Sequence, residues 1–501
     1  MTCHHRQGCD LRVTIMRTWQ TRRLLARAWQ ALLALDIAEA ERLATRLEHF
    51  RAATGASVED CPTAVLRAAL LAVQDDSTAA RALAQKAHLT CADVECRALA
   101  VMICRWAHWR AGELNEFHSA GRTQWRAGLR RCRATTIIFD LNLEAAVEFG
   151  RLRLTVSRKL ATEALERARS TACSESAAGL LAAALMAQVA YEQGQLEEAE
   201  LTIRYRMSVI RTSATIECVT RAYIILARLA RRSDLALTLL RDAQVLGERR
   251  RWPRLVAAML AERVRILLDD NEETDALSCL GDLETLLRSR PMLNASAQAD
   301  IEFDCQIAQL RVKQRHVAAA QTASAAESLR QKALARSDLR LALEMHLLSV
   351  AAYARSGEIF EAQERLIDAL DIGATNGLCM TFVDAGPVVR KLLQELCHDP
   401  SLADERVLEL RPYLHTLLAR FPEAQRPASS VRQAIHHPLT PREGNVLRLI
   451  ASGLSNKRIA QRLDITPETV KSHTKSIFAK LAAQTRAQAV AHGEALGLIQ
   501  S

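Results

Sequence analysis

Three polar side chains near the carboxyl end of this 501-residue chain have a spacing that suits contact with a polyanion. Lys471, Ser472 and Lys475 fall within about one helical turn, so in a helix they point to the same side. Lysine ammonium groups donate hydrogen bonds to phosphates and to guanine acceptors, and a serine hydroxyl serves base edges or the phosphate backbone. The segment therefore predicts a helix that presents donors to nucleic acid.

The element that must position these donors is a helix starting at Pro467. Proline suits the first helical position, because its missing N–H would be unsatisfied there, and Glu468 in the first turn suits the helix dipole. Val470, Thr474 and Ile477 recur at i, i+4 and i+7, which predicts that they face a core. The three donors are then expected to point away from that core.

A second helix is predicted just before this one. Ser455 can cap it, and Ile459, Ala460 and Leu463 lie on one of its faces. Residues 464–465 form the turn between the two helices, and the basic residues on the earlier helix suit phosphate contacts. The further candidate DNA contacts are Asn456, Lys457, Arg458, Arg462, Thr466 and Thr469.

Two flanking helices complete a four-helix unit. Residues 440–443 read Thr-Pro-Arg-Glu, a capping box with proline at the first helical position, and Gly453 is a natural helix stop. Thr485 and Gln488 have the spacing of another capping box, and Gly497 ends that helix.

Residues 439–486 resemble the DNA-binding domain of the LuxR (FixJ/NarL) family of bacterial transcription regulators. The resemblance implies a helix-turn-helix whose later helix enters the major groove, with Lys471, Ser472 and Lys475 at base- and phosphate-contacting positions. It also implies double-stranded DNA and RNA polymerase as partners, a homodimer on DNA, and a cytoplasmic location. Val490 and the leucines after it offer apolar surface for the dimer.

One departure from that family lies in the first helix of the unit. Gly444 and Asn445 stand where relatives have a long polar residue followed by glutamate. Glycine inside a helix costs about 1 kcal/mol relative to alanine, so this helix is expected to be weaker than usual. The departure does not touch the DNA-facing surface.

The composition bounds the fold class of the whole chain. Hydrophobic residues make up 49% and charged residues 25%, which are globular values, while aromatic residues make up only 4%. Alanine, leucine and arginine dominate, so the sequence predicts an all-α protein packed through small and aliphatic side chains.

The positive charge of the chain is concentrated at the carboxyl end. Between residues 436 and 501, nine Lys and Arg residues face four acidic ones, which gives +5 of the total of +10. This pattern is typical of a polyanion-binding segment. The thirteen cysteines are scattered without a Cys-x-x-Cys motif, so reduced thiols in a cytoplasmic protein are expected. There is also no apolar stretch of the length that a membrane span needs.

Residues 19–421 repeat a unit made of an amphipathic helix, a short break and a second helix. The clearest examples are residues 187–200, with a break at Gly194, and residues 351–362, with a break at Gly357. Weaker breaks occur at Asp36, Asp75, Gly112, Gly150, Ser233, Asn271 and His316. Successive breaks are about 37 to 45 residues apart, a period that resembles tetratricopeptide repeats and predicts a superhelix that senses a signal or binds partners.

The end of this repeat region is more specific. Residues 369–393 and 413–421 resemble the end of the superhelical domain in MalT-type regulators, the large ATP-binding members of the LuxR family. The predicted organisation is a disordered tail over residues 1–18, the repeat domain over 19–421, a linker over 422–437 and the helix-turn-helix domain over 438–501.

The chain departs from MalT-type regulators because it has no P-loop sequence, so their ATP-driven switch is not transferred. Two expectations follow: either the protein is a shortened regulator that senses with its repeats alone, or an upstream portion was lost or not included. The motifs Gly-x-Ser-x-Gly and His-Glu-x-x-His are also absent, so no catalytic role, no cofactor and no metal site are expected. Cys3, His4, His5 and Cys9 fit no standard zinc spacing.

The sequence therefore favours a transcription regulator controlled by a small-molecule or protein effector on the repeats. The main alternative is a helical-repeat scaffold whose chief role is protein binding. A sigma-factor-like promoter reader and an ATP-dependent regulator remain further alternatives.

Overall fold

The computed structural model describes residues 20–53, 61–91, 93–122, 134–230, 232–289, 295–398, 405–421, 441–451, 454–463 and 465–480, with residues 486, 489 and 490. All regular elements in these residues are helices, which confirms the all-α prediction. The chain divides into two compact units, Met1–Phe421 and Pro422–Ser501. The predicted tail over residues 1–18 and the predicted linker over 422–437 lie outside the described residues.

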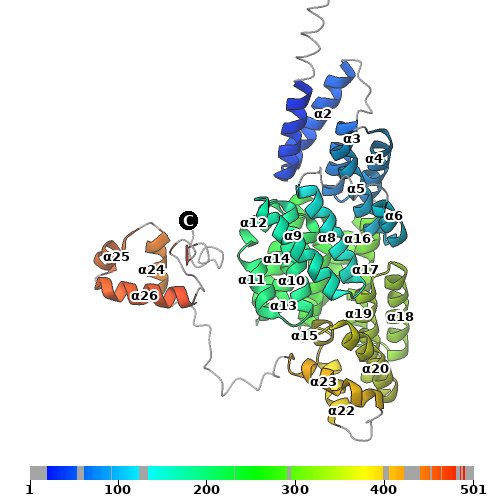
Figure 1. Cartoon of the computed structure of the whole chain (residues 1–501). Coiled ribbons are helices and arrows are strands. Elements are labelled where there is room, and N and C mark those ends of the chain that lie inside the picture. Colours follow the sequence, from blue (N-terminus) through cyan, green and yellow to red (C-terminus); the bar gives the residue numbers. More distant parts are fainter. Residues whose placement is uncertain are drawn as a thin grey trace, which may run out of the picture. The chain divides into compact units, whose positions relative to one another are not determined.

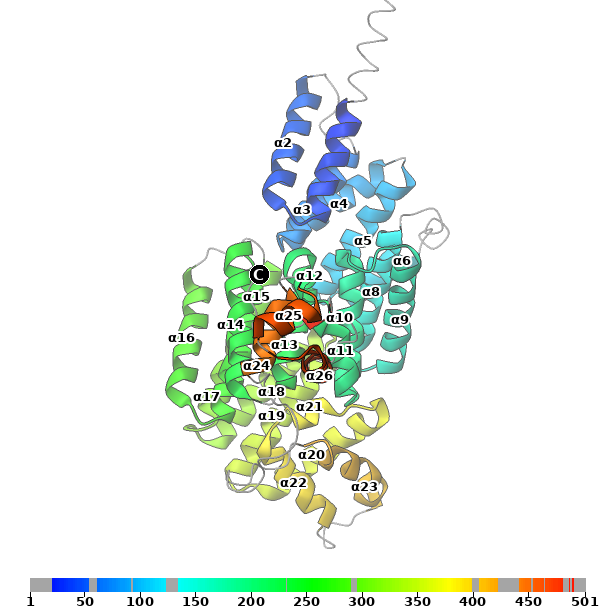
Figure 2. The same cartoon turned by 90° about the vertical axis from the view of Figure 1, so that its left-hand side faces the viewer.

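The helices of the first unit follow one another as stacked antiparallel pairs (Figures 1 and 2). They are residues 20–33, α2 (Ile37–Ala53), α3 (Cys61–Val73), α4 (Ser77–Thr90), α5 (Val94–Ala111), α6 (Leu114–Arg122), α8 (Ala134–Gly150), α9 (Leu154–Ser170), α10 (Ala177–Glu192), α11 (Leu196–Arg204), α12 (Met207–Ser213), α13 (Ile216–Leu229), α14 (Ser233–Arg250), α15 (Pro253–Asp269), α16 (Glu273–Ser289), α17 (Ala295–Lys313), α18 (Ala319–Ala335), α19 (Leu339–Arg355), α20 (Ile359–Asn376), α21 (Met380–Val383), α22 (Pro387–His398) and α23 (Glu405–Leu418).

The predicted breaks coincide with the turns inside these pairs. Gly194 and Gly357 adopt left-handed backbone conformations with φ of 73° and 86°, which glycine tolerates without steric cost. The following amides close the preceding helices, as Gln195 N donates to Ala190 O over 2.8 Å. No breaks were predicted at the turns between successive pairs, where Ala172, Arg251 and Ser337 take the left-handed positions.

Helix α10 lies in the middle of the unit and is buried almost all round. From Ala178 to Ala187 every residue is buried, and Val189, Ala190 and Tyr191 follow. A helix that is apolar on every side requires neighbours on every side, and its alanines let those neighbours approach closely. The repeats therefore wrap around α10 instead of leaving one of its faces to solvent.

The segments that the sequence singled out at residues 187–200, 369–393 and 413–421 lie together in space. Cys379 N donates to Glu192 O over 2.9 Å, and Arg420 Nη1 donates to Gly194 O over 2.7 Å. Tyr413 Oη donates to Leu378 O over 2.6 Å, which closes the same cluster. The last helices of the unit are thus fixed to the α10–α11 turn.

Buried ion pairs join early repeats to late ones. Arg254 of α15 contacts Asp75 of the α3–α4 turn over 2.7 Å and Glu217 of α13 over 2.9 Å. Asp300 of α17 contacts Arg110 over 2.6 Å and Arg336 over 2.5 Å. Because these six residues come from six different segments, this set, called here the central ion network, fixes how the repeats stack.

The structure contradicts the predicted redox state of one cysteine. Cys91 is disulfide-bonded, so the prediction of reduced thiols throughout is wrong at this position. Disulfide pairing depends on which side chains the fold brings together, and sequence spacing alone does not reveal that. The free cysteines among the described residues are Cys96, Cys104, Cys173, Cys218, Cys279, Cys305, Cys379 and Cys397. Burial raises the pKa of the Cys218 thiol to about 12, which keeps it protonated.

The second unit contains α24 (Pro441–Ala451), α25 (Asn456–Leu463) and α26 (Pro467–Lys480), with α26 packed against both other helices (Figure 1). Of the predicted fourth helix, residues 486, 489 and 490 are described, and all are helical. Helices α24 and α26 begin at the prolines that the sequence indicated. Gly453, Asp464, Thr485 and Gly497 lie outside the described residues.

Candidate nucleic-acid interface

A small apolar core holds the three helices of the second unit in place. Val446 and Leu447 of α24, Ile459 of α25, and Val470 and Ile477 of α26 are fully buried against one another. Ile459, Val470 and Ile477 are positions that helical periodicity assigned to the interior. Because one side of each of the three helices packs into this core, the opposite sides of α25 and α26 are exposed to solvent.

The amino-terminal end of α26 is held by its cap. Thr466 Oγ1 accepts a hydrogen bond from Thr469 N over 3.2 Å, and the two threonine hydroxyls lie 2.8 Å apart. Thr474, predicted to face inward, is half-buried, and its hydroxyl donates to Val470 O over 2.8 Å. The cap and the core together fix the rotation of α26 about its axis.

The three predicted donors lie on the exposed part of α26. Lys471, Ser472 and Lys475 are all exposed. Lys471 Nζ lies 3.1 Å from Glu468 Oε2, in an ion pair whose side chains are 63% and 79% exposed. An exposed pair of this kind contributes little to stability, so its lysine is readily drawn to a stronger anion.

The predicted contacts on α25 fall into two groups. Lys457, Arg458 and Arg462 are exposed, as expected for residues that meet phosphates. Asn456 is half-buried, and its Oδ1 accepts from Arg486 Nη1 over 2.5 Å. Its amide oxygen is therefore engaged inside the unit, and only the amide nitrogen is left for an external acceptor.

Two positioning contacts were not anticipated from the sequence. Arg486 also donates through Nη2 to Leu454 O over 2.6 Å, so it links the fourth helix to the start of α25. Ser476 on α26 donates to Glu443 Oε1 on α24 over 2.7 Å, and Glu443 is only 4% exposed. Partners about thirty residues apart leave no periodic signal, so sequence patterns cannot find them.

The apolar surface expected to serve a dimer is partly used within the unit. Val490 packs against the same core as Val470 and Ile477. The leucines that follow it lie outside the described residues.

In the part of the chain that the structure describes, every helix is too short or too polar to span a lipid bilayer. No group of three or more His, Cys, Asp or Glu residues there is arranged to hold a metal ion.

Family models match both units. One described as the MalT-like TPR region matches residues 62–399, and one described as bacterial regulatory proteins, luxR family, matches residues 437–492.

Curated relatives match over a shorter stretch. The chain is 32% identical over 167 residues to the HTH-type transcriptional regulator MalT of Klebsiella pneumoniae subsp. pneumoniae, covering 30% of this chain and 18% of that protein. It is 33% identical over 156 residues to the protein of the same name from Vibrio cholerae serotype O1, covering 28% of this chain and 17% of that protein. The alignments thus span less than a fifth of these relatives. The family model for the MalT-like TPR region covers more than half of this chain, so the chain belongs to the family with a MalT-like TPR region. Its carboxyl-terminal part is a domain of the luxR family of bacterial regulatory proteins.

Proposed function

We propose that this protein is a transcription regulator that binds double-stranded DNA in a sequence-specific manner through α26 in the major groove. The observation that carries the proposal is the exposed set Lys471, Ser472 and Lys475 on a helix that a buried core and the Thr466 cap hold in one orientation. A rigid helix with donors on one side matches how helix-turn-helix proteins read base edges. The luxR-family match over the same residues supports it.

Phosphate contacts would fix the register of α26 in the groove. Lys457, Arg458 and Arg462 supply exposed positive charge from α25, and Thr466 and Thr469 supply hydroxyls at the amino-terminal end of α26, where anions are favoured. We include the amide nitrogen of Asn456 in this set, because its oxygen is already held by Arg486.

The first unit would control this activity. We propose that a small molecule or protein effector binds the helical repeats and changes DNA binding or recruitment of RNA polymerase. The protein would act in the cytoplasm as a homodimer on DNA, since two-fold protein symmetry matches two half-sites. The proposal includes no catalytic step and no cofactor.

The test begins with selection of bound fragments from genomic DNA, followed by titration of the full chain against the selected duplex at several salt concentrations. Lys475→Ala is expected to weaken binding and to lower the slope of log K against log salt by about 0.9, because one phosphate contact is lost. Ser472→Ala is expected to change sequence preference more than the salt slope.

Lys391→Ala is the matched control, because Lys391 is an exposed lysine on α22 of the first unit, with a side chain that is 77% exposed. The proposal fails if Lys475→Ala and Lys391→Ala bind the duplex equally well. Tight partner proteins without any DNA retention at low salt would instead favour the scaffold alternative.

A further inference from the structure

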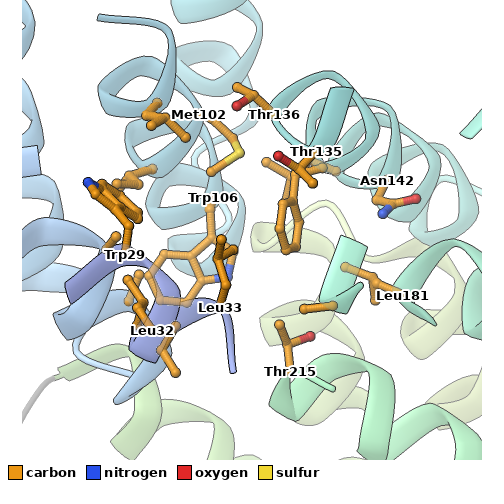
Figure 3. A pocket seen from close by; sticks show the side chains of 18 of the residues that line it. Trp29, Leu32, Leu33, Met102, Trp106, Thr135, Thr136, Asn142, Leu181 and Thr215 are labelled. Carbon is orange, nitrogen blue, oxygen red and sulfur yellow. The ribbon is translucent and has the colours of Figure 1, made fainter. Parts of the chain in front are cut away.

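The first unit contains a cavity of about 670 Å³ that the DNA-binding proposal does not use (Figure 3). It lies between the helix over residues 20–33 and helices α3, α5, α8, α10 and α13. Trp29, Leu32 and Leu33 line one wall, while Thr136 and Leu181 line the opposite side. Sites for small organic molecules typically enclose about 300–1,000 Å³, so the volume suits one such molecule.

The walls of this cavity are unusually aromatic for this chain. Trp29, Trp106 and Trp109 line it, so three of the six tryptophans in the chain gather at one place. Phe139 adds a fourth ring, and Met102 lies beside Trp106 in Figure 3. Aromatic faces offer large contact areas with little conformational freedom to lose, which favours a flat, apolar ligand.

Two buried oxygens at the cavity lack hydrogen-bond partners among the described residues. Asn142 is fully buried, and its Nδ2 donates to Ala178 O over 2.8 Å while its Oδ1 has no partner in that part of the chain. The Oγ1 of Thr215 is likewise buried without a partner there. A buried polar atom left unpaired costs about 1–3 kcal/mol, and a ligand donor would remove that cost once neighbouring side chains shift to admit it.

Three of the five charged side chains that line the cavity are engaged with protein groups, and the other two are Arg22 and Glu95. Glu217 binds Arg254 over 2.9 Å, and Arg221 Nε donates to Gln188 Oε1 over 2.7 Å. Asp93 caps α5 through a hydrogen bond of 2.8 Å from Cys96 N. An ionic ligand would have to displace these contacts, so the cavity favours an uncharged one.

We propose that this cavity is the effector site and that it takes an uncharged, largely apolar molecule with an aromatic ring and at least one hydrogen-bond donor. This inference rests on the proposed regulatory function. The lining includes residues 22–35 and residues 177–221, which belong to separate repeats. A ligand that contacts residues of both repeats stabilises the packing in which these repeats meet. Ligand binding can therefore shift the conformation of the superhelix.

The test uses N-phenyl-1-naphthylamine, an uncharged aromatic probe with one N–H donor, titrated into the purified full chain. Saturable binding of one probe per chain is expected, with energy transfer from the tryptophans that line the cavity.

Ala69→Phe places a ring in the cavity from a half-buried position on α3, and we expect it to weaken binding at least about tenfold, or about 1.4 kcal/mol. Ala354→Phe, at a half-buried position on α19 outside the cavity lining, is the matched control and should bind as wild type.

A second variant guards against loss of folding. Leu33 lines the cavity and is 51% exposed, so Leu33→Lys adds a charge at the rim without disturbing the core, and we expect weaker probe binding here too. Equal probe affinity in wild type, Ala69→Phe and Leu33→Lys would overturn the assignment, as would the absence of saturable binding to wild type.

Binding of the selected DNA by the same preparation separates the two proposals. Intact DNA binding without probe binding rejects the cavity alone, whereas probe binding without any DNA binding rejects the regulatory function and with it the effector role.

Discussion

A hydrogen bond between two side chains adds to the apolar core in linking α24 and α26. The Ser476 hydroxyl donates to Glu443 over 2.7 Å, and the carboxylate is almost completely buried. Arg486 makes a comparable link from the fourth helix to Asn456 and to Leu454 O. These residues contact no base in the proposed complex, yet they determine how α26 is presented.

At the residue scale, Glu443→Ala is expected to destabilise the second unit by about 1–3 kcal/mol, because Ser476 loses a buried acceptor. DNA affinity should fall while the salt slope stays constant, since no phosphate contact is removed. The measurement is the urea concentration at which the full chain releases the selected duplex, read at two salt concentrations. Asn445→Ala, an exposed change on α24 away from the DNA-facing surface, is the control and should leave that midpoint nearly unchanged. A normal midpoint for Glu443→Ala would show that this contact does not position α26.

At the scale of elements, glycines inside helices have opposite roles in the two units. In α20, a Cβ added at Gly373 would lie 2.4 Å from both Phe382 Cε2 and Tyr413 Oη, so only glycine lets these rings approach the helix. In α24, a Cβ at Gly444 would meet only Arg448 Nη2, at 4.0 Å. The first glycine is required by packing, and the second is tolerated by an otherwise regular helix.

Alanine at these two positions should therefore change stability in opposite directions. Gly373→Ala is expected to destabilise the first unit by about 1–3 kcal/mol through overpacking. Gly444→Ala is expected to stabilise the second unit by about 0.5–1 kcal/mol, because alanine loses less backbone entropy in a helix. Urea unfolding of each variant, followed by proteolysis of each unit, gives both values. The same sign of change in the two variants would contradict this account of helix packing.

At the scale of the whole molecule, the central ion network joins repeats that are far apart in sequence. Arg254 meets Asp75 across 179 positions, and Arg336 donates to Arg110 O across 226 positions. Asp304 lies beside this network. Its pKa is raised to about 7, mainly by burial and also by the charges of Asp300 and Glu344, against the opposing effect of Arg254 and Arg336. A carboxyl group that titrates near neutral pH thus lies beside the network that joins the repeats.

The sign of this pH dependence follows from the direction of the shift. The unfolded chain releases the Asp304 proton near pH 3.8, whereas the folded protein holds it up to about pH 7, so stability falls as the pH rises through that window. Asp304→Asn removes this loss, and its melting temperature should exceed that of wild type by a margin that grows from pH 5 to pH 8. Thermal melts at three pH values provide the check. A margin independent of pH would mean that Asp304 does not titrate differently on folding.

The sequence by itself determined the helical class, the placement of the breaks inside the repeats and the helices around Pro441 and Pro467. These features are local, because helical periodicity, caps and left-handed glycines act over a few residues. The exposed state of Lys471 and Lys475 also follows from the buried positions of Val470 and Ile477 on the same helix.

Only the tertiary structure decided which distant residues meet. It placed Asn456 against Arg486, joined residues 187–200 to residues 369–421, paired Cys91 in a disulfide, and gathered three tryptophans around one cavity. Non-glycine residues at the left-handed turns Ala172, Arg251 and Ser337 also gave no local sign. Such contacts depend on the rotation and stacking of whole helices, and no pattern within one helix encodes them.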